Sequence, residues 1–224
     1  MKILFVGNSY TYFNEMPKLF EALARENGKQ VDVDSVTKGG RKLYENLNPQ
    51  DEYHQKIVSL CQENAYDVLI LQEQSYFALV DFEKFVEGLA GLMELIRAKR
   101  TVFYATWGRK AGCPLLDELG LTSSQMTEKL SKAYRAAADR LGTEVSPVGI
   151  CFAAVSERDA SVNLYIHDLS HPSVTGSSLA AMVHYTKIFG EAPKTCRALS
   201  LDPDTEKLFL SVLAEGKSNF EKRR

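Results

Sequence analysis

The sequence predicts an α/β fold in which a parallel β-sheet lies between two layers of helices, a three-layer α/β/α sandwich. Three observations predict it. Short apolar runs alternate with segments of helical periodicity along the chain. One run, Asp67–Leu71, is almost entirely apolar, which is typical of a strand buried on both faces. The chain has 224 residues, 45% of them hydrophobic, so we expect a single domain over residues 1–224 with a sizeable core.

The first half of the chain contains three predicted strands. Lys2–Val6 is a short apolar strand, and Glu15–Asn27 follows as an amphipathic helix with a proline in its first turn. Gln30–Val36 alternates between apolar and polar residues, which indicates a strand nearer the edge of the sheet. A helix is expected over Glu52–Asn64, and it leads into the buried strand Asp67–Leu71.

The second half continues the alternation. A strongly amphipathic helix, Phe82–Lys99, precedes a fourth strand at Thr101–Thr106, and Trp107–Leu121 is expected to be a loop because it contains glycine and proline. The remaining predicted elements are a helix at Ser123–Leu141, a strand at Glu144–Pro147, a short helix at Gly149–Ser156, and helices at Ser173–Phe189 and Pro203–Gly216. We interpret the terminal Glu221–Arg224 as a solvated end.

Composition excludes several classes of protein. The net charge is −2 and the body of the chain has no basic run, so nucleic acid is not an expected partner. The apolar start is too short for a signal peptide, and no run approaches the ~18 apolar residues of a membrane span, so we expect a cytoplasmic protein without a membrane partner. No metal site is expected, and the widely spaced cysteines are interpreted as free thiols: Cys61, Cys113, Cys151 and Cys196. The sequence predicts no oligomeric state.

This architecture indicates where a ligand should bind. In open parallel sheets, ligands bind beyond the carboxyl ends of the strands. One segment there is Gly7-Asn8-Ser9-Tyr10-Thr11, which follows the first strand and precedes a helix. A serine at this place can expose its hydroxyl near backbone N–H groups and the positive end of the helix. The alternatives are that Asn8 or Ser9 only caps the helix, or that the turn binds phosphate.

A second segment with chemical potential is Asp168-Leu169-Ser170-His171-Pro172, which also precedes a helix. Aspartate and histidine three residues apart on a turn can place the carboxylate against Nδ1 of the imidazole. The other ring nitrogen is then free to accept a proton from a serine near neutral pH. Alone, this pattern fits equally well an aspartate turn followed by a surface histidine.

Together, these two segments resemble the GDSL/SGNH hydrolase family, whose members have a flavodoxin-like parallel sheet. Ser146-Pro147-Val148-Gly149 is also similar to that family, and the resemblance covers most of the chain. Four segments match in the family's order, and we name them the nucleophile block (Gly7–Thr11), the glycine block (Gly39–Arg41), the third block (Leu71–Ser75) and the last block (Asp168–Pro172).

The resemblance implies that Ser9 is the nucleophile, His171 its base and Asp168 the residue that orients the base. It implies an ester substrate, one candidate being an acetylated carbohydrate, and no metal or organic cofactor. A thioesterase or lysophospholipase would use the same residues. A silent module that binds a small ligand on the same fold is the alternative from a different class.

The oxyanion hole implied by the resemblance consists of the N–H groups of Ser9 and Gly40 and a side-chain amide from the third block. Gly39 could replace Gly40. The third block of the family usually reads G-x-N-D, and this chain offers Gln74 in place of the asparagine, with Gln72 two residues earlier. We expect Gln74 to be the donor.

Other residues receive structural interpretations. Asn8 stands where the family usually has aspartate, and we expect little consequence for the chemistry because asparagine is also a good turn former. We expect His54 and His184 to lie on helices without partners, and His167 to point away from Asp168. Trp107 and Tyr10 either line the pocket or pack beside it. The chain has no G-x-S-x-G, dinucleotide or P-loop motif, which disfavours those enzyme classes.

Overall fold

The computed structural model describes residues 1–216, so the interpretation of Glu221–Arg224 as a solvated end concerns residues outside the described part. Five strands form one parallel sheet in the order β2-β1-β3-β4-β5, which is the flavodoxin-like order, and the predicted fold class is confirmed. Their bounds are β1 (Lys2–Gly7), β2 (Asp32–Thr37), β3 (Val68–Leu71), β4 (Arg100–Tyr104) and β5 (Glu144–Ser146). The second strand is at the edge of the sheet, as its alternating pattern indicates.

The predicted helices are found close to their expected bounds, and several short ones are additional. The α-helices are α1 (Ser9–Tyr12), α2 (Met16–Glu26), α3 (Glu52–Glu63), α4 (Phe77–Val80), α5 (Phe82–Ile96), α6 (Pro114–Leu119), α7 (Ser123–Leu141), α8 (Val148–Arg158), α9 (Val174–Phe189) and α10 (Pro203–Glu215). Three turns of 3₁₀-helix are η1 (Phe13–Glu15), η2 (Leu43–Leu47) and η3 (Arg197–Leu199).

The expectation of a loop over Trp107–Leu121 is wrong for part of that segment, because it contains α6. Pro114 occupies the first turn of α6, where its missing N–H costs nothing, and Gly120 ends the helix in a left-handed conformation at φ 61°. The glycine and proline that indicated a loop therefore mark the two ends of a six-residue helix. A helix of that length is too short to show an amphipathic period.

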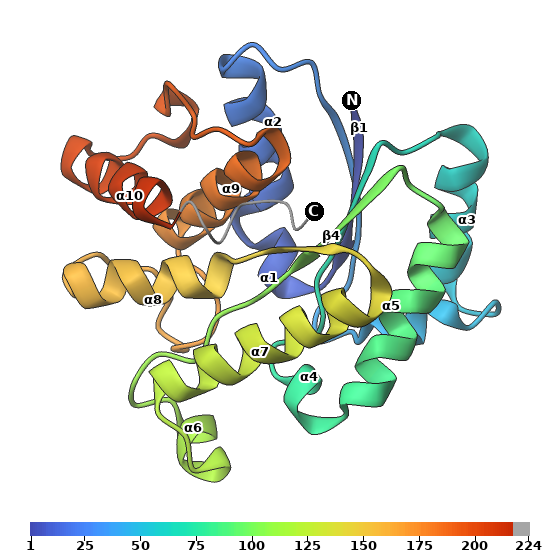
Figure 1. Cartoon of the computed structure of the whole chain (residues 1–224), viewed down its shortest axis with the longest axis horizontal. Helices are drawn as coiled ribbons and strands as arrows, with labels where there is room; N and C mark the ends of the chain where they lie inside the picture. The colour runs from blue at the N-terminus through green and yellow to red at the C-terminus, as the bar shows by residue number, and fades with distance from the viewer. Residues whose placement is uncertain (217–224) are drawn as a thin grey trace.

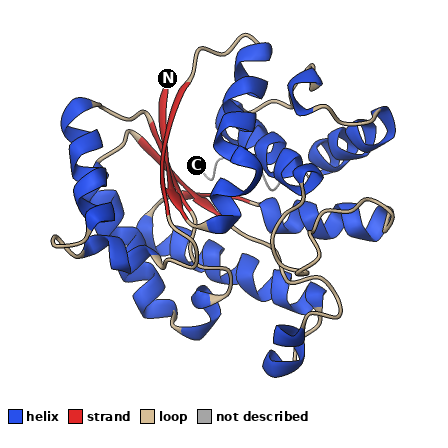
Figure 2. Ribbon diagram, turned by 180° about the vertical axis from the view of Figure 1, so that it is seen from behind, coloured by secondary structure: helices blue, strands red, loops and turns tan. Residues whose placement is uncertain are grey.

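Two layers of helices cover the sheet (Figures 1 and 2). Alternate residues of β1 point to opposite faces, as expected for a strand. Ile3 and Phe5 pack into the core formed with α2, α8, α9 and α10, whereas Leu4 and Val6 pack into the core formed with α3, α5 and α7. Both faces of β1 are thus buried, which explains its continuous apolar run.

The strand order reverses between β1 and β3, since β2 lies on one side of β1 and the later strands lie on the other. Crevices for ligands form at this switch point, beyond the carboxyl ends of the two strands. The nucleophile block leaves β1 there, and the third block leaves β3 beside it, because Val6 pairs with Leu71. Topology alone therefore places these two blocks together.

The Ser146–Gly149 segment has a structural explanation. It joins β5 to α8, and the amide of Gly149 donates to the carbonyl of Ala105 at 3.0 Å. A Cβ at position 149 would lie 2.1 Å from the carbonyl oxygen of Thr106, so only glycine permits this approach. Ser146 Oγ contacts His184 Nδ1 at 2.9 Å, which links the end of β5 to α9.

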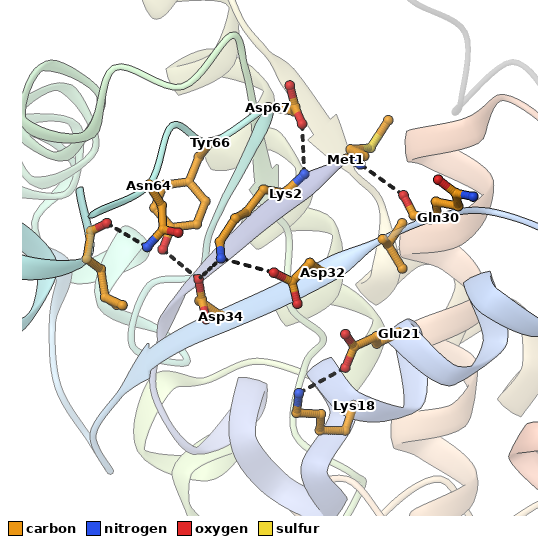
Figure 3. A network of polar contacts seen from close by, with 12 residues as sticks. Met1, Lys2, Lys18, Glu21, Gln30, Asp32, Asp34, Asn64, Tyr66 and Asp67 are labelled. Carbon is orange, nitrogen blue, oxygen red and sulfur yellow. Dashed lines mark hydrogen bonds and ion pairs between the residues drawn. The ribbon is translucent and has the colours of Figure 1, made fainter. Parts of the chain in front are cut away.

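The amino ends of the strands carry a network of charged residues (Figure 3). Lys2 Nζ lies 3.0 Å from Asp32 Oδ2 and 3.3 Å from Asp34 Oδ2, and its backbone N–H donates to Asp67 at 2.7 Å. Tyr66 donates its hydroxyl to Asp34 at 2.8 Å. These contacts join β1 to β2 and β3 at the amino ends of the strands, whereas the nucleophile block and the third block follow their carboxyl ends. Within residues 1–216, every helix is too short or too polar to cross a bilayer.

Candidate active site

Ser9 lies at the first position of α1, one residue beyond the N-cap Asn8. The Asn8 side chain accepts a hydrogen bond from the amide of Tyr10 at 3.3 Å, which caps the short helix. Gly7 permits the tight exit from β1, because a Cβ there would lie 2.5 Å from Thr11 Oγ1. Asn8 is therefore the residue that caps the helix, as one of the alternative interpretations proposed. The Ser9 hydroxyl does not take part in this cap.

That hydroxyl contacts the last block. Ser9 Oγ lies 2.8 Å from His171 Nε2, and His171 Nδ1 lies 2.5 Å from Asp168 Oδ2. Ser9 and His171 are 162 residues apart in the sequence, so their meeting depends on the whole fold. The structure brings the three predicted residues into one chain of hydrogen bonds, with His171 between a hydroxyl and a carboxylate.

The turn of the last block explains how Asp168 reaches His171. Asp168 Oδ1 accepts from the backbone amides of Ser170 and His171, each at 2.9 Å, so the carboxylate organises its own turn. Leu169 takes a left-handed conformation at φ 59° to make the turn. Partial burial works to raise the pKa of Asp168, but the hydrogen bonds from the His171 side chain and the two amides outweigh it and lower that pKa. Asp168 is therefore a stable carboxylate partner for the imidazole.

Aromatic side chains fix the histidine ring. Phe13, in η1, stacks on His171 with ring centroids 4.4 Å apart, and Tyr10 meets the same ring edge-on at 5.4 Å. Phe13 follows Ser9 by four residues, so the segment that supplies the serine also orients its partner. Phe13 was not predicted to be part of the site, although three aromatic residues within Tyr10–Phe13 could have indicated an aromatic environment next to Ser9.

Trp107 and Tyr10 are packing residues rather than pocket surfaces. Trp107 is fully buried, and its ring stacks on Tyr10 at 4.6 Å and on Phe152 at 4.0 Å. Both hold the last block through Ser170. Tyr10 contacts the hydroxyl of Ser170 at 2.9 Å, and the Trp107 indole donates to its carbonyl at 3.0 Å. The two rings thereby position the residue next to His171.

Gln72 is fully buried, and its side chain makes three hydrogen bonds within the fold. Its Oε1 accepts from the amide of Asn8 at 2.9 Å and from Thr11 Oγ1 at 2.8 Å, while its Nε2 donates to the carbonyl of Glu73. The side chain thus fixes the position of the nucleophile block through Asn8 and Thr11. The second N–H of Nε2 lies on a side chain that is fully buried and held by three hydrogen bonds.

Gln74 lies two residues further along the chain than Gln72 and is half-buried. Its Nε2 donates to Ser75 Oγ at 3.2 Å, and its Oε1 accepts from the amide of Tyr76 at 3.3 Å. Both contacts are long and both are local, so the amide can exchange them for a ligand at small cost. Of the two glutamines, Gln74 is the one whose side chain is partly exposed and held only by long contacts.

Glu73 is a residue that the sequence analysis did not select. It is fully buried, and its carboxylate accepts from the amide of Leu43 at 3.2 Å and from the amide of Gln74 at 2.5 Å. Burial raises the pKa of Glu73 to about 8, against the opposing effect of these two amides. The carboxylate therefore joins the third block to the segment that follows the glycine block. The only sequence signal was an acidic residue directly after a buried strand.

The glycine block lies beside the nucleophile block. Gly40 adopts φ 69°, a left-handed conformation that favours glycine, and its N–H donates to no acceptor within residues 1–216. Asn8 Nδ2 donates to the carbonyl of Arg41 at 3.0 Å and so ties this turn to Ser9. An aspartate has no N–H to make that bond, so asparagine has a structural role here beyond the turn, and the expectation of little consequence for the chemistry stays a prediction. A Cβ on Gly39 would approach the Tyr12 hydroxyl to 3.1 Å.

Two histidine predictions are wrong. His54 is not without a partner, because its Nδ1 contacts the carbonyl of Asn46 at 2.8 Å. His184 contacts Ser146, as described above, and burial lowers its pKa to about 3, so it stays neutral. Within the described chain, the side chain of Asp168 contacts His171 and not His167. His171 is therefore the histidine that meets both a hydroxyl and a carboxylate.

Comparisons with known proteins give the family. No protein-family model matches the chain, and no curated protein matches it. A solved protein from Slackia heliotrinireducens, provisionally described as an SGNH hydrolase, is 30% identical and superposes with a TM-score of 0.72 over 83% of this chain and 97% of that one. A DUF4886 family protein from Bacteroides uniformis is 15% identical, with a TM-score of 0.76 over 100% of this chain and 97% of its own.

An acetyl xylan esterase is also similar in fold, at 15% identity and a TM-score of 0.63 over 84% of this chain and 100% of its own. The resemblance inferred from the four blocks is thus confirmed by a relative that matches in sequence as well as in fold. This chain belongs to the GDSL/SGNH hydrolase family.

Proposed function

We propose that this protein hydrolyses carboxylic esters through an acyl-enzyme on Ser9. The observation that carries the proposal is the continuous chain of contacts from Ser9 Oγ through His171 to Asp168. A serine hydroxyl needs an adjacent base to become a nucleophile at neutral pH, and the base needs a partner that fixes its tautomer. Each of the three groups has the neighbour that its role requires.

The reaction takes two steps. Ser9 Oγ bonds to the ester carbonyl carbon while its proton passes to His171 Nε2, and the C–O bond to the alcohol then breaks as His171 returns the proton to the leaving oxygen. In the second step, water attacks the acyl carbon and gives its proton to His171. The bond to Ser9 Oγ breaks, and the serine recovers that proton as the acid leaves.

In this mechanism the oxyanion is held by the N–H groups of Ser9 and Gly40 and by Gln74 Nε2. Three observations support this assignment. The amide of Gly40 has no acceptor within the described residues, Asn8 ties the glycine block to the nucleophile block, and the contacts of Gln74 are long. Gln72 is disfavoured because its side chain is fully buried and held in place by three hydrogen bonds.

The substrate we propose is an ester of a small molecule, and an acetylated carbohydrate is the leading candidate. The similarity in fold to an acetyl xylan esterase supports that class. Thioesters and lysophospholipids are the second candidates, since one fold neighbour is a lipase/acylhydrolase from Enterococcus faecalis. The chemistry at Ser9 is the same for all of them.

Labelling and kinetics test the proposal together. A fluorophosphonate probe should add to Ser9 in the wild-type protein, and Ser9→Ala should lose both labelling and p-nitrophenyl acetate hydrolysis, with kcat falling by about 10⁴-fold or more. Ser123→Ala, at the start of α7, is the matched control. Labelling that persists in Ser9→Ala would refute the assignment, and a silent binding module would show neither labelling nor turnover. A panel of acetylated sugars, acyl-CoA thioesters and lysophospholipids then identifies the substrate class.

A further inference from the structure

Arg109 is a cation at the edge of the candidate active site. It lies in the loop that follows β4, and Arg109 Nη2 donates to Ser75 Oγ at 2.8 Å. Its guanidinium carbon lies over the Tyr10 ring, 5.6 Å from the centroid. Ser75 adjoins Gln74 and Tyr10 adjoins Ser9, so these two contacts hold the charge beside both the nucleophile block and the third block.

The charge of Arg109 has no carboxylate partner among residues 1–216. Its recorded polar contact is to the neutral Ser75 hydroxyl, and its Nε is shielded from solvent without any acceptor. Other arginines at partly buried places are paired. Arg41 contacts Asp51 at 2.5 Å, and Arg100 contacts Glu144 at 2.8 Å. An unpaired, partly desolvated guanidinium is costly, which favours binding of an anion that is not part of residues 1–216.

The position of Ser75 in the third block accounts for the missing partner. Where the family's G-x-N-D pattern ends in aspartate, this chain has Ser75. A carboxylate at that position, in contact with Arg109, would neutralise the guanidinium. A serine hydroxyl fixes the side chain through one hydrogen bond but leaves its positive charge available. The loop also keeps Arg109 near the last block, because the amide of Lys110 donates to the carbonyl of Leu169 at 2.8 Å.

We propose that Arg109 binds a carboxylate on the ester substrate, so that this protein prefers anionic esters over neutral ones. The inference rests on the proposed function, since it assigns the substrate class of the same site. The planar guanidinium fork fits a carboxylate with two hydrogen bonds, and its outer edge keeps donors for one: Nη1 has no acceptor within residues 1–216, and Ser75 takes only one of the two N–H groups of Nη2. The carboxylate can belong to the acyl part or to the alcohol part of the ester.

Two pairs of matched substrates test the preference and separate these sources. The acyl pair is mono-p-nitrophenyl glutarate and p-nitrophenyl pentanoate, which share a leaving group. The alcohol pair is para-acetoxyphenylacetate and its methyl ester, in which a methylene group insulates the leaving oxygen from the charge. Wild-type protein should show kcat/KM about tenfold higher for the anionic member of one pair, the value of a charged hydrogen bond. Rates with Ser9→Ala give the background, which matters for the glutarate because it can cyclise.

Variants at position 109 assign the preference to the guanidinium. Arg109→Met, which keeps an unbranched apolar side chain, should bring the anionic-to-neutral ratio close to one. Arg109→Lys should retain part of the ratio, because it keeps the charge but not the fork. Lys110→Met, which removes the exposed neighbouring charge, should keep the wild-type ratio. The ratio in each variant is compared at equal fluorophosphonate labelling, which shows that the site is folded.

Two results would overturn the inference. The first is wild-type protein that shows no preference for the anionic member of either pair, a result that needs no variant. The second is Arg109→Met that lowers kcat/KM equally for both members, which would make Arg109 a support of the oxyanion hole instead. In either case loss of turnover in Ser9→Ala would leave the proposed function standing. Turnover that survives Ser9→Ala would reject the proposed function itself.

Discussion

The strands of the sheet begin at what we call the amino edge and end at the carboxyl edge. Both edges are rich in polar contacts, but the contacts are of different kinds. At the amino ends of the strands, charged side chains pair with one another near the surface, and Asp32 keeps a side-chain exposure of 65% (Figure 3). At the carboxyl ends, Gln72 and Glu73 are fully buried. Gln72 binds the backbone amide of Asn8 in the nucleophile block, and Glu73 binds that of Leu43, which follows the glycine block. At the amino ends most of these contacts join charged side chains, whereas at the carboxyl ends the buried groups bind mainly backbone amides.

This difference indicates which edge can act on a ligand. Paired surface charges satisfy each other, and each pair contributes little to stability because solvent screens it. Buried groups that bind backbone fix the segments around Ser9 and so hold its hydroxyl against His171. Changes at the carboxyl edge should therefore alter catalysis, and changes at the amino edge should alter stability slightly and catalysis not at all.

The largest effect is expected for His171→Ala. Removal of the imidazole leaves Ser9 without a base, and kcat for p-nitrophenyl acetate should fall by about 10⁴-fold or more. His167→Ala is the matched control, because His167 is exposed and does not contact Asp168. Its kcat should stay within about twofold of wild type, as for a surface substitution. An inactive His167→Ala together with an active His171→Ala would mean that the assignment of the base is wrong.

Gln74→Ala should have the next largest effect. Loss of one oxyanion donor costs about 10²–10³ in kcat. KM should change little, since the interaction forms only as the oxyanion develops. Gln72→Ala is the comparison: it leaves the amide of Asn8 without its acceptor and should lower the free energy of unfolding by about 1–3 kcal/mol. If neither variant lowers kcat tenfold, the hole consists of backbone N–H groups alone and the alignment of the third block is wrong.

Glu73→Gln tests the buried carboxylate through pH. The pKa of Glu73 is about 8 in the folded protein against 4.5 for the free group, so the folded state binds its proton more tightly. Between pH ~5 and ~8 the folded state holds more protons than the unfolded chain, and stability falls as pH rises through this window. Relative to Glu73→Gln, the wild-type protein should therefore lose free energy of unfolding from pH 5 to pH 8.

Denaturant unfolding of both proteins at several pH values measures this difference. Glu87→Gln is the control, because Glu87 lies on α5, is exposed and is not among the charges that shift the pKa of Glu73, whereas Glu45 helps to raise that pKa. It should keep the pH dependence of the wild-type protein. If Glu73→Gln follows the wild-type profile as well, Glu73 does not titrate in this window and the carboxylate is ionised throughout.

The sequence predicted those parts of the site that depend on neighbours in the chain or on strand order. Asp168 and His171 are three residues apart on one turn, and Ser9 follows a strand that the apolar pattern reveals. The supporting residues were not predicted, because their partners are distant. Gln72 and Asn8 are 64 residues apart, and Glu73 contacts Leu43 across 30 residues. Such pairs are specified by the packing of loops beyond β1 and β3, which no local pattern encodes.

The smallest effect is expected at the amino edge, for Lys2→Met. Lys2 Nζ contacts Asp32 and Asp34, but the lysine side chain is 26% exposed and Asp32 is largely exposed, so screening reduces the value of both pairs. The free energy of unfolding should fall by at most about 1 kcal/mol, and the loss should shrink as salt is added. Lys2→Arg, which restores the charge, should recover most of it. The kcat of both variants should equal that of the wild-type protein, since the backbone N–H of Lys2 still binds Asp67 and β1 keeps its register. A tenfold fall in kcat for Lys2→Met would show that the amino ends of the strands influence Ser9, and the distinction between the two edges would then fail.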